Sequence, residues 1–176
     1  MIKRIAIVGP ESTGKSQLAQ QLAAQYETVW VEEFARYYVE NLDRPYTEED
    51  LQVIAAGQLT EEDKAAQNAN SLLFCDTNLI VVKVWSEYKY QRCHPWILNN
   101  MQLDKYALHL LTAPDIGWEP DPLREHPDKR EELFEIYERE LDEANVSYRV
   151  VYGHDELRMK VAMNYVEEML VSLETP

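Results

Sequence analysis

The 176-residue sequence has few cysteines and no long apolar run. Its two cysteines, Cys75 and Cys93, are too few for a disulfide framework or a zinc-binding pattern, which indicates a reducing compartment. No apolar run approaches the roughly 18 residues that a transmembrane helix needs, and the first residues lack the pattern of a signal peptide. We therefore expect a cytoplasmic protein that has no membrane partner.

Basic residues are also scarce, because 17 Lys and Arg stand against 32 Asp and Glu, for a formal net charge of −15. So few basic residues do not easily form the positive stripe that binds nucleic-acid phosphates, and we expect no nucleic-acid partner. A small phosphorylated ligand is compatible with this charge, because backbone N–H groups and a few arginines can create a local positive field. The sequence leaves the oligomeric state open.

The strongest motif lies near the N-terminus, where the apolar residues 5–8 lead into a glycine-containing loop. Residues 9–16 read Gly-Pro-Glu-Ser-Thr-Gly-Lys-Ser and match G-x-x-x-x-G-K-[ST] without mismatch. In this pattern backbone N–H groups surround nucleotide phosphates, Lys15 reaches the β- and γ-phosphates and Ser16 holds Mg²⁺. ATP and Mg²⁺ are therefore the expected cofactors, and a plain glycine turn is the structural alternative. The predicted nucleotide-binding residues are Gly9, Glu11, Ser12, Thr13, Gly14, Lys15, Ser16 and Gln17.

Apolar periodicity predicts alternating strands and helices, and the length suits one α/β domain covering residues 1–176. Strands are expected at residues 5–8, 28–31, 71–77, 106–112 and 147–152, and helices at 17–26, 32–38, 47–70, 79–90, 128–144 and 157–173. This order predicts a three-layer α/β/α fold with a five-stranded parallel sheet, in which ligands bind at the carboxyl ends of the strands. Residues 113–127 contain four prolines and one glycine, so we expect an ordered loop that serves as a lid.

Charged residues follow the second expected strand. Glu32 and Glu33 leave it where small-molecule kinases place the acceptor hydroxyl, so one of them is expected to orient a ribose and accept its proton. Arg36, one helical turn after Glu33, would present a guanidinium to the same substrate. A solvated acidic turn and a surface ion pair are the structural alternatives. The residue types do not decide which of the two glutamates faces the pocket.

Two further charged residues lie at the ends of the third and fourth expected strands. Asp76 ends an apolar run, where a carboxylate can bind Mg²⁺ directly or through water, or can instead cap the following helix. Arg124, in the proline-rich loop, is expected to close over a transferring phosphoryl group, with an exposed surface charge as the alternative. The predicted catalytic residues are Lys15, Glu33, Asp76 and Arg124.

Aromatic residues provide candidates for stacking on a heteroaromatic base. Trp85, Tyr88, Trp96 and Trp118 are suitable, although an aromatic side chain in such a chain more often packs in the core. Trp118 is the exception, because a tryptophan in a loop has little core to fill. We predict Tyr88 and Trp118 as substrate contacts and interpret His94, which precedes a proline, as structural.

Several of these motifs together resemble the kinase domain of NadR-type proteins, the P-loop nicotinamide riboside kinases of NAD salvage. The resemblance spans roughly residues 1–152, and the G-P-E-S-T-G-K-S form of the loop together with E-F-A-R is more specific than the loop pattern alone. The motifs that carry it are G-P-E-S-T-G-K-S at residues 9–16, E-F-A-R at 33–36, F-C-D-T at 74–77, D-I-G-W at 115–118 and L-R at 123–124.

The resemblance implies a P-loop kinase-like fold and transfer of the ATP γ-phosphate to the 5′-hydroxyl of nicotinamide riboside, which gives nicotinamide mononucleotide. It assigns Glu33 and Arg36 to the substrate side, Asp76 to the metal side, and Trp118 with Arg124 to the lid.

Two positions depart from the family pattern. Asn78 stands where the family often has a second acidic residue, and Pro122 stands where a glycine is usual. The chain lacks room for the DNA-binding and adenylyltransferase domains of larger members, so we expect a free-standing kinase. The residues alone leave two alternatives open: a kinase for another nucleoside or a nucleoside monophosphate, and a regulatory P-loop protein that binds or slowly hydrolyses a nucleotide.

Overall fold

The computed structural model describes residues 2–121 and 123–174. These residues form one parallel sheet whose strand order is β2-β3-β1-β4-β5, so β1 lies at its centre. The predicted five-stranded parallel sheet is therefore confirmed. The strands are β1 (Lys3–Val8), β2 (Trp30–Val31), β3 (Leu72–Asp76), β4 (Tyr106–Thr112) and β5 (Tyr148–Val151).

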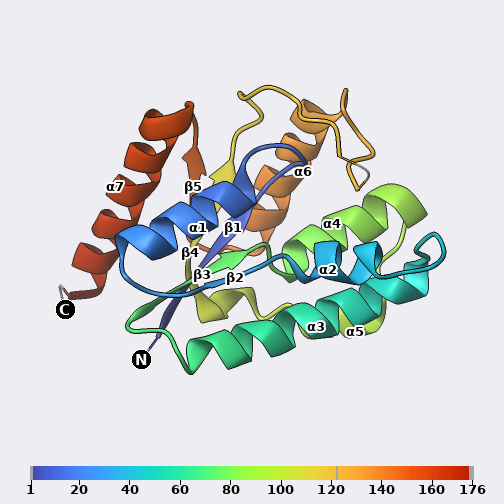
Figure 1. Ribbon diagram of the computed structural model, residues 1–176, viewed down its shortest axis with the longest axis horizontal. Coiled ribbons are helices and arrows are strands. Elements are labelled where there is room, and N and C mark those ends of the chain that lie inside the picture. Colours follow the sequence, from blue (N-terminus) through green and yellow to red (C-terminus); the bar gives the residue numbers. More distant parts are fainter. Residues whose placement is uncertain (1, 122, 175–176) are drawn as a thin grey trace.

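Helices cover both faces of the sheet, as Figure 1 shows, with α1 and α7 on one side and α4 and α6 on the other. The α-helices of the described residues are α1 (Lys15–Gln25), α2 (Phe34–Glu40), α3 (Glu48–Ala66), α4 (Leu79–Tyr90), α5 (Pro95–Asn99), α6 (Arg130–Glu143) and α7 (Asp155–Glu174), and a short 3-10 helix, η1 (Leu103–Lys105), precedes β4. Within the part of the chain that the structure describes, no helix has both the length and the apolarity of a membrane span.

The central strand explains the three layers, because successive side chains of a strand point to opposite faces. Ile5 and Ile7 pack in the cluster that contains α1 and α7, whereas Ala6 and Val8 pack in the cluster that contains α4 and α6. All four side chains are buried, which accounts for an unbroken apolar run rather than an alternating pattern. The predicted α/β/α architecture follows from this two-sided burial and is confirmed.

Helix boundaries are set by capping residues. Thr47 and Asp50 form a capping box at the start of α3, where the sequence predicts a helix start. Asn78 caps α4 by accepting a hydrogen bond from the backbone N–H of Ile80, so the capping role considered for Asp76 belongs to Asn78. His94 caps α5, a short helix that the sequence analysis missed because its signal is a single His-Pro pair.

The predicted length differs most from the structure in α3, which ends at Ala66 rather than near residue 70. The helix continues through Gly57. Residues 113–127, here called the lid loop, contain no helix or strand among the residues described, as predicted. In Figure 1 this loop runs from β4 over the carboxyl end of the sheet to α6.

Gly57 allows close packing of α3 against the start of α2. A Cβ atom at this position would lie 2.1 Å from Cε1 of Phe34, far closer than atoms can approach. We expect Gly57→Ala to lower the free energy of unfolding by about 2 kcal/mol, because overpacking outweighs the gain in helix propensity. Urea unfolding measures this difference. Phe34→Leu combined with Gly57→Ala should recover part of the loss, whereas stabilisation by Gly57→Ala alone would contradict the packing argument.

Candidate active site

The loop between β1 and α1, here called the P-loop (residues 9–16), has a backbone that requires glycine at two positions. Gly9 has a φ of +135°, and a Cβ there would lie 2.9 Å from the carbonyl oxygen of Thr112. Gly14 has a φ of +75°, a left-handed conformation, directly before the first residue of α1. Helix α1 therefore begins at Lys15 and directs its positive N-terminal end into the loop, as an anion-binding site requires.

Polar contacts hold the P-loop in place. The hydroxyl oxygen of Thr112, at the end of β4, lies 2.7 Å from that of Thr13 and 3.1 Å from the carbonyl oxygen of Val8. Lys15 Nζ donates a hydrogen bond of 2.7 Å to the carbonyl oxygen of Pro10. Burial lowers the pKa of the Lys15 ammonium. An ammonium has three N–H donors, so this bond leaves capacity for phosphate oxygens.

Asp76 ends β3 with a buried carboxylate, 1% exposed, that has an incomplete set of partners. Its Oδ1 atom has no hydrogen-bond partner among the described residues. Burial and the nearby Glu33 carboxylate raise the pKa of Asp76 to about 7, and a hydrogen bond from Ser16 opposes that rise. An orphaned carboxylate oxygen beside a hydroxyl provides the hard oxygen donors that Mg²⁺ prefers, so these residues fit the predicted metal.

The residues that the structure describes contain no cluster of three or more His, Cys, Asp or Glu side chains suited to a metal. Proteins commonly bind Mg²⁺ through one or two side-chain oxygens together with substrate phosphates and water, and Ser16 and Asp76 would provide side-chain oxygens of this kind. This arrangement needs both the P-loop and a phosphorylated ligand.

Gln58 of α3 contacts both the start of α2 and the end of β3. Its side-chain oxygen accepts a 2.9 Å hydrogen bond from the backbone N–H of Phe34, the first residue of α2. Its side-chain nitrogen lies 3.5 Å from the carbonyl oxygens of Asp76 and Thr77. Gln58 therefore ties the start of α2 to the end of β3. No sequence signal pointed to Gln58, because its partners are far away along the chain.

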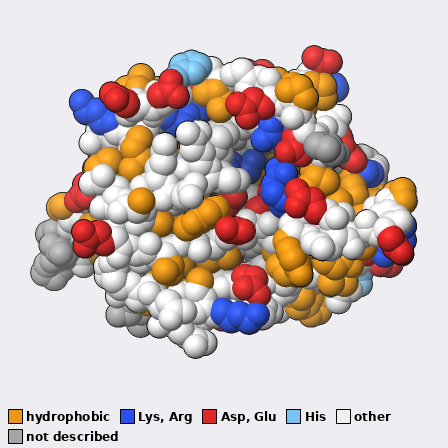
Figure 2. Space-filling view, in the orientation of Figure 1, with side chains coloured by type: hydrophobic (Ala, Val, Ile, Leu, Met, Phe, Trp, Pro, Cys, Tyr) orange, Lys and Arg blue, Asp and Glu red, His pale blue; other side chains and the backbone are white. Residues whose placement is uncertain are grey.

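A cavity of about 320 Å³ opens between the P-loop, α2, α4 and the lid loop. In Figure 2 the hollowed part of the visible face carries acidic and basic side chains side by side. Every predicted nucleotide-binding residue, from Gly9 to Gln17, lines this cavity. The other predicted residues on its wall are Glu33, Arg36, Tyr88 and Arg124.

The structure separates the two adjacent glutamates. Glu33 lines the cavity, and its negative charge acts to raise the pKa of both Lys15 and Asp76. Glu32 is exposed to solvent. The backbone turn from β2 into α2 places the two side chains in different surroundings, which residue type alone does not reveal.

Two arginines join the lid loop to the rest of the site. Arg36 pairs with Asp121 of the lid loop at 3.0 Å and, more weakly, with Glu40 at 3.5 Å. Arg124 donates to the hydroxyl oxygen of Ser12 in the P-loop at 3.3 Å. The cavity thus has a guanidinium on its α2 side and another on its lid side.

Aromatic side chains form the wall of the cavity opposite the P-loop. Tyr46, Trp85 and Tyr88 line it, and the Tyr46 and Trp85 rings meet at 4.8 Å with an interplanar angle of 65°. Trp118 is not among the described residues on this wall, because its ring faces the guanidinium of Arg130 at 5.8 Å. The structure therefore does not bring the predicted stacking residue Trp118 to the cavity, whereas Tyr46 was missed.

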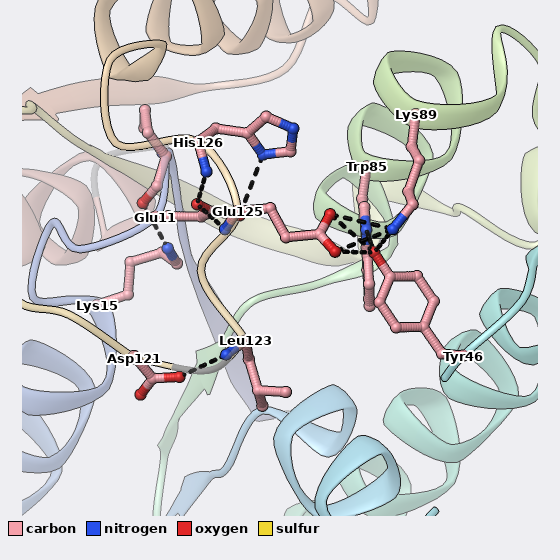
Figure 3. Close-up of polar contacts among 10 residues, drawn as sticks. Glu11, Lys15, Tyr46, Trp85, Lys89, Asp121, Leu123, Glu125 and His126 are labelled. Carbon is pink, nitrogen blue, oxygen red and sulfur yellow. Dashed lines mark hydrogen bonds and ion pairs between the residues drawn. The ribbon is translucent and has the colours of Figure 1, made fainter. Parts of the chain in front are cut away.

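The lid loop is bonded to the P-loop through Glu11, whose carboxylate is drawn in Figure 3. Glu11 Oε2 accepts hydrogen bonds of 3.0 Å from the backbone N–H groups of Glu125 and His126. Glu11 Oε1 also lies 3.4 Å from Nδ1 of His126. Glu11 was predicted to contact the nucleotide. In the structure its carboxylate accepts hydrogen bonds from two residues of the lid loop.

Arg158 is a further residue of the site that sequence reasoning missed. This buried guanidinium donates to the carbonyl oxygens of Thr13 at 3.0 Å, Gly153 at 2.8 Å and Ala113 at 3.1 Å, and it pairs with Asp115. It therefore links α7 to the P-loop and to the ends of β4 and β5. Arg158 lies in a helix that carries many charges, so its role follows only from tertiary structure.

Asn78 and Pro122 are the two positions that depart from the family pattern, and the structure describes only Asn78. Asn78 is fully buried, caps α4 and lies with its side-chain nitrogen 3.2 Å from Nε2 of His109. Its side chain is therefore occupied by structural contacts. Pro122 lies outside the described residues.

The comparison with known proteins places the chain among P-loop proteins. A family model described as "AAA domain" matches residues 4–158. The trifunctional NAD biosynthesis/regulator protein NadR of Escherichia coli (strain K12) is 27% identical over 178 residues, which cover 96% of this chain and 43% of that protein. NadR of Salmonella typhimurium is 29% identical over 129 residues, which cover 70% of this chain and 31% of that protein. The chain therefore spans less than half the length of these curated relatives.

Solved structures share the fold. The crystal structure of NadR in complex with NAD and AMP-PNP aligns with a TM-score of 0.79 at 22% identity, covering 96% of this chain and 49% of that one. The crystal structure of NadR in complex with NR aligns with a TM-score of 0.77 at 23% identity, covering 96% of this chain and 51% of that one. Deoxyadenosine kinase from M. mycoides with bound dATP aligns with a TM-score of 0.64 at 15% identity, covering 93% of this chain and 99% of that one. The resemblance to NadR-type proteins that the motifs indicate is confirmed.

Proposed function

The chain belongs to the AAA domain family, and from this premise we propose that it is a kinase that transfers the γ-phosphate of ATP to the 5′-hydroxyl of nicotinamide riboside. The product would be nicotinamide mononucleotide. One observation carries the proposal: a single cavity connects the P-loop to Glu33, to Arg36 and to an aromatic wall. Phosphoryl transfer consists mainly of positioning and charge neutralisation, and this cavity offers groups for both.

The donor end of the cavity suits a nucleotide triphosphate. The P-loop backbone and the N-terminal end of α1 would bind the phosphates, and Lys15 would contact the β- and γ-phosphates. Ser16 and Asp76 would hold Mg²⁺, which supplies positive charge against the phosphate oxygens. Arg124, which already reaches Ser12, would stabilise the charge that develops on the transferring group.

The acceptor end suits a ribose that carries an aromatic cation. Glu33 would accept the proton of the attacking hydroxyl, and Arg36 would contact the sugar from the same side. The nicotinamide ring of the riboside bears a positive charge. Such rings are attracted to tyrosine and tryptophan side chains, and Tyr46, Trp85 and Tyr88 line the cavity. The similarity to NadR, which has been solved in complex with NR, supports this substrate.

A coupled assay of ATP consumption tests the proposal. We expect nicotinamide riboside to stimulate turnover more than uridine, thymidine or nucleoside monophosphates, and mass spectrometry should identify nicotinamide mononucleotide. A better response to another nucleoside would replace the substrate while keeping the kinase. If no acceptor stimulates turnover, a regulatory nucleotide-binding protein becomes the better interpretation.

A further inference from the structure

Four side chains form a hydrogen-bonded cluster at the aromatic end of the cavity, here called the Tyr46 cluster: Tyr46, Trp85, Lys89 and Glu125. The Tyr46 hydroxyl lies 2.9 Å from both carboxylate oxygens of Glu125, and Trp85 Nε1 donates to it at 3.0 Å. Lys89 Nζ donates to the same hydroxyl and to Glu125 at 2.9 Å. Figure 3 shows the four side chains converging from α4, the lid loop and the segment before α3.

The cluster uses the full bonding capacity of the Tyr46 phenol. A phenol donates one hydrogen bond and accepts two, and here the Tyr46 hydroxyl donates to the Glu125 carboxylate while Trp85 and Lys89 donate to its oxygen. The Lys89 ammonium also lies 4.1 Å from the centre of the Tyr46 ring. These contacts fix the plane of a ring that lines the cavity.

Glu125 also connects this cluster to the opposite end of the cavity. Its backbone N–H donates to the Glu11 carboxylate of the P-loop, and its side chain bonds to Tyr46 and Lys89. Glu11 lies in the stretch that would surround the phosphates. Within the described part of the chain, one residue of the lid loop therefore bonds both to the P-loop and to the aromatic wall.

Building on the proposed function, we propose that Glu125 and Lys89 are positioning residues for the nucleoside. They act through Tyr46, whose ring they hold against the acceptor's base. Through the Glu11 contact, Glu125 makes the position of that ring depend on the state of the P-loop. Neither Glu125 nor Lys89 is among the described residues that line the cavity, so their effect on substrate binding is indirect.

The competing explanation is an ordinary surface ion pair. The side chains of Lys89 and Glu125 are 32% and 34% exposed, and exposed ion pairs contribute little on their own. The Tyr46 cluster differs because its charged hydrogen bonds converge on one phenol, and charge-assisted hydrogen bonds are the stronger kind. A kinetic experiment can separate the two explanations, because a surface ion pair would not change the affinity for the nucleoside selectively.

Steady-state kinetics with nicotinamide riboside and ATP provide the first test. We expect Lys89→Met and Tyr46→Phe each to raise the KM for the nucleoside about fivefold, while kcat and the KM for ATP stay within about twofold. Tyr46→Phe keeps the ring and removes only the oxygen that the cluster shares. Lys89→Arg should restore most of the affinity. Lys64→Met, which removes an exposed pair with Glu61 on α3, is the matched control and should change nothing.

Hydrogen–deuterium exchange provides a readout that needs no substrate. The amides of Glu125 and His126 bond to Glu11, so Lys89→Met should speed their exchange if the cluster restrains this part of the lid loop, whereas Lys64→Met should not. Unchanged exchange in Lys89→Met, or equal rises in both KM values, would overturn the inference. If the wild-type protein accepts no nucleoside, the proposed function fails and the positioning role fails with it. If it accepts a nucleoside but Lys89→Met and Tyr46→Phe keep the wild-type KM for it, only the positioning role fails.

Discussion

Replacement of Asp76 by alanine or asparagine is expected to lower kcat by about a thousandfold, which corresponds to about 4 kcal/mol of transition-state stabilisation. The buried Asp76 carboxylate has an oxygen without a partner among the described residues and lies beside Ser16, so we expect it to bind Mg²⁺. A Mg²⁺ titration of activity measures the effect. Both variants should need far more Mg²⁺ for half-maximal rate, and wild-type kcat in either would show that the metal carboxylate lies elsewhere.

Asp76→Asn should also make the folded state more stable at high pH. A variant that loses activity but gains stability separates a catalytic role of Asp76 from a structural one. The pKa of Asp76 is raised to about 7 from an ordinary value of 3.8. The folded state therefore disfavours the charged carboxylate, and this destabilisation grows as pH rises from about 4 and is complete above about 7. We expect Asp76→Asn to raise Tm at pH 8 in the presence of a chelator and to leave Tm almost unchanged near pH 4.

Much of the fold could be predicted because its signals are local. The limits of β4 and α4 match the expected residues 106–112 and 79–90, since an apolar run and a helical stripe each depend on neighbouring positions. The P-loop could be predicted for the same reason. Its backbone needs positive φ angles at Gly9 and Gly14, and both glycines lie within one motif of eight residues. Strand ends in a parallel sheet meet at one edge, so the prediction that site residues cluster there follows from the order of elements.

The parts that could not be predicted depend on contacts between distant residues. Gln58 and Arg158 support the site from helices α3 and α7, and nothing in their local sequence marks them. Tyr46 and Trp118 are both loop aromatics, yet only Tyr46 lines the cavity, because the lid loop turns Trp118 onto Arg130. Sequence reasoning identifies residue types that suit a task, whereas tertiary packing decides which of them reaches the cavity.

The pair Glu32 and Glu33 offers the sharpest test of the acceptor site, because the two residues are adjacent and chemically identical. Glu33→Gln is expected to lower kcat with nicotinamide riboside about a hundredfold or more, since a positioned general base contributes about 10²–10⁴-fold. Glu32→Gln, which changes an exposed side chain, should leave kcat within about twofold. Steady-state kinetics on the two variants and the wild type measure the difference, and nucleotide binding should persist in both.

The position of Glu33 predicts how its loss should divide between kinetic parameters. Glu33 lies on the cavity wall and its charge acts on both Lys15 and Asp76, so its removal should also lower the pKa of Asp76 toward the ordinary value. That change favours the charged form of Asp76 at neutral pH, and a Mg²⁺ titration of Glu33→Gln should therefore show a half-maximal Mg²⁺ concentration close to that of the wild type if the fall in kcat comes from loss of the base. A loss of equal size in Glu32→Gln, or a rise in the KM for ATP without a change in kcat, would contradict a role for Glu33 as the base.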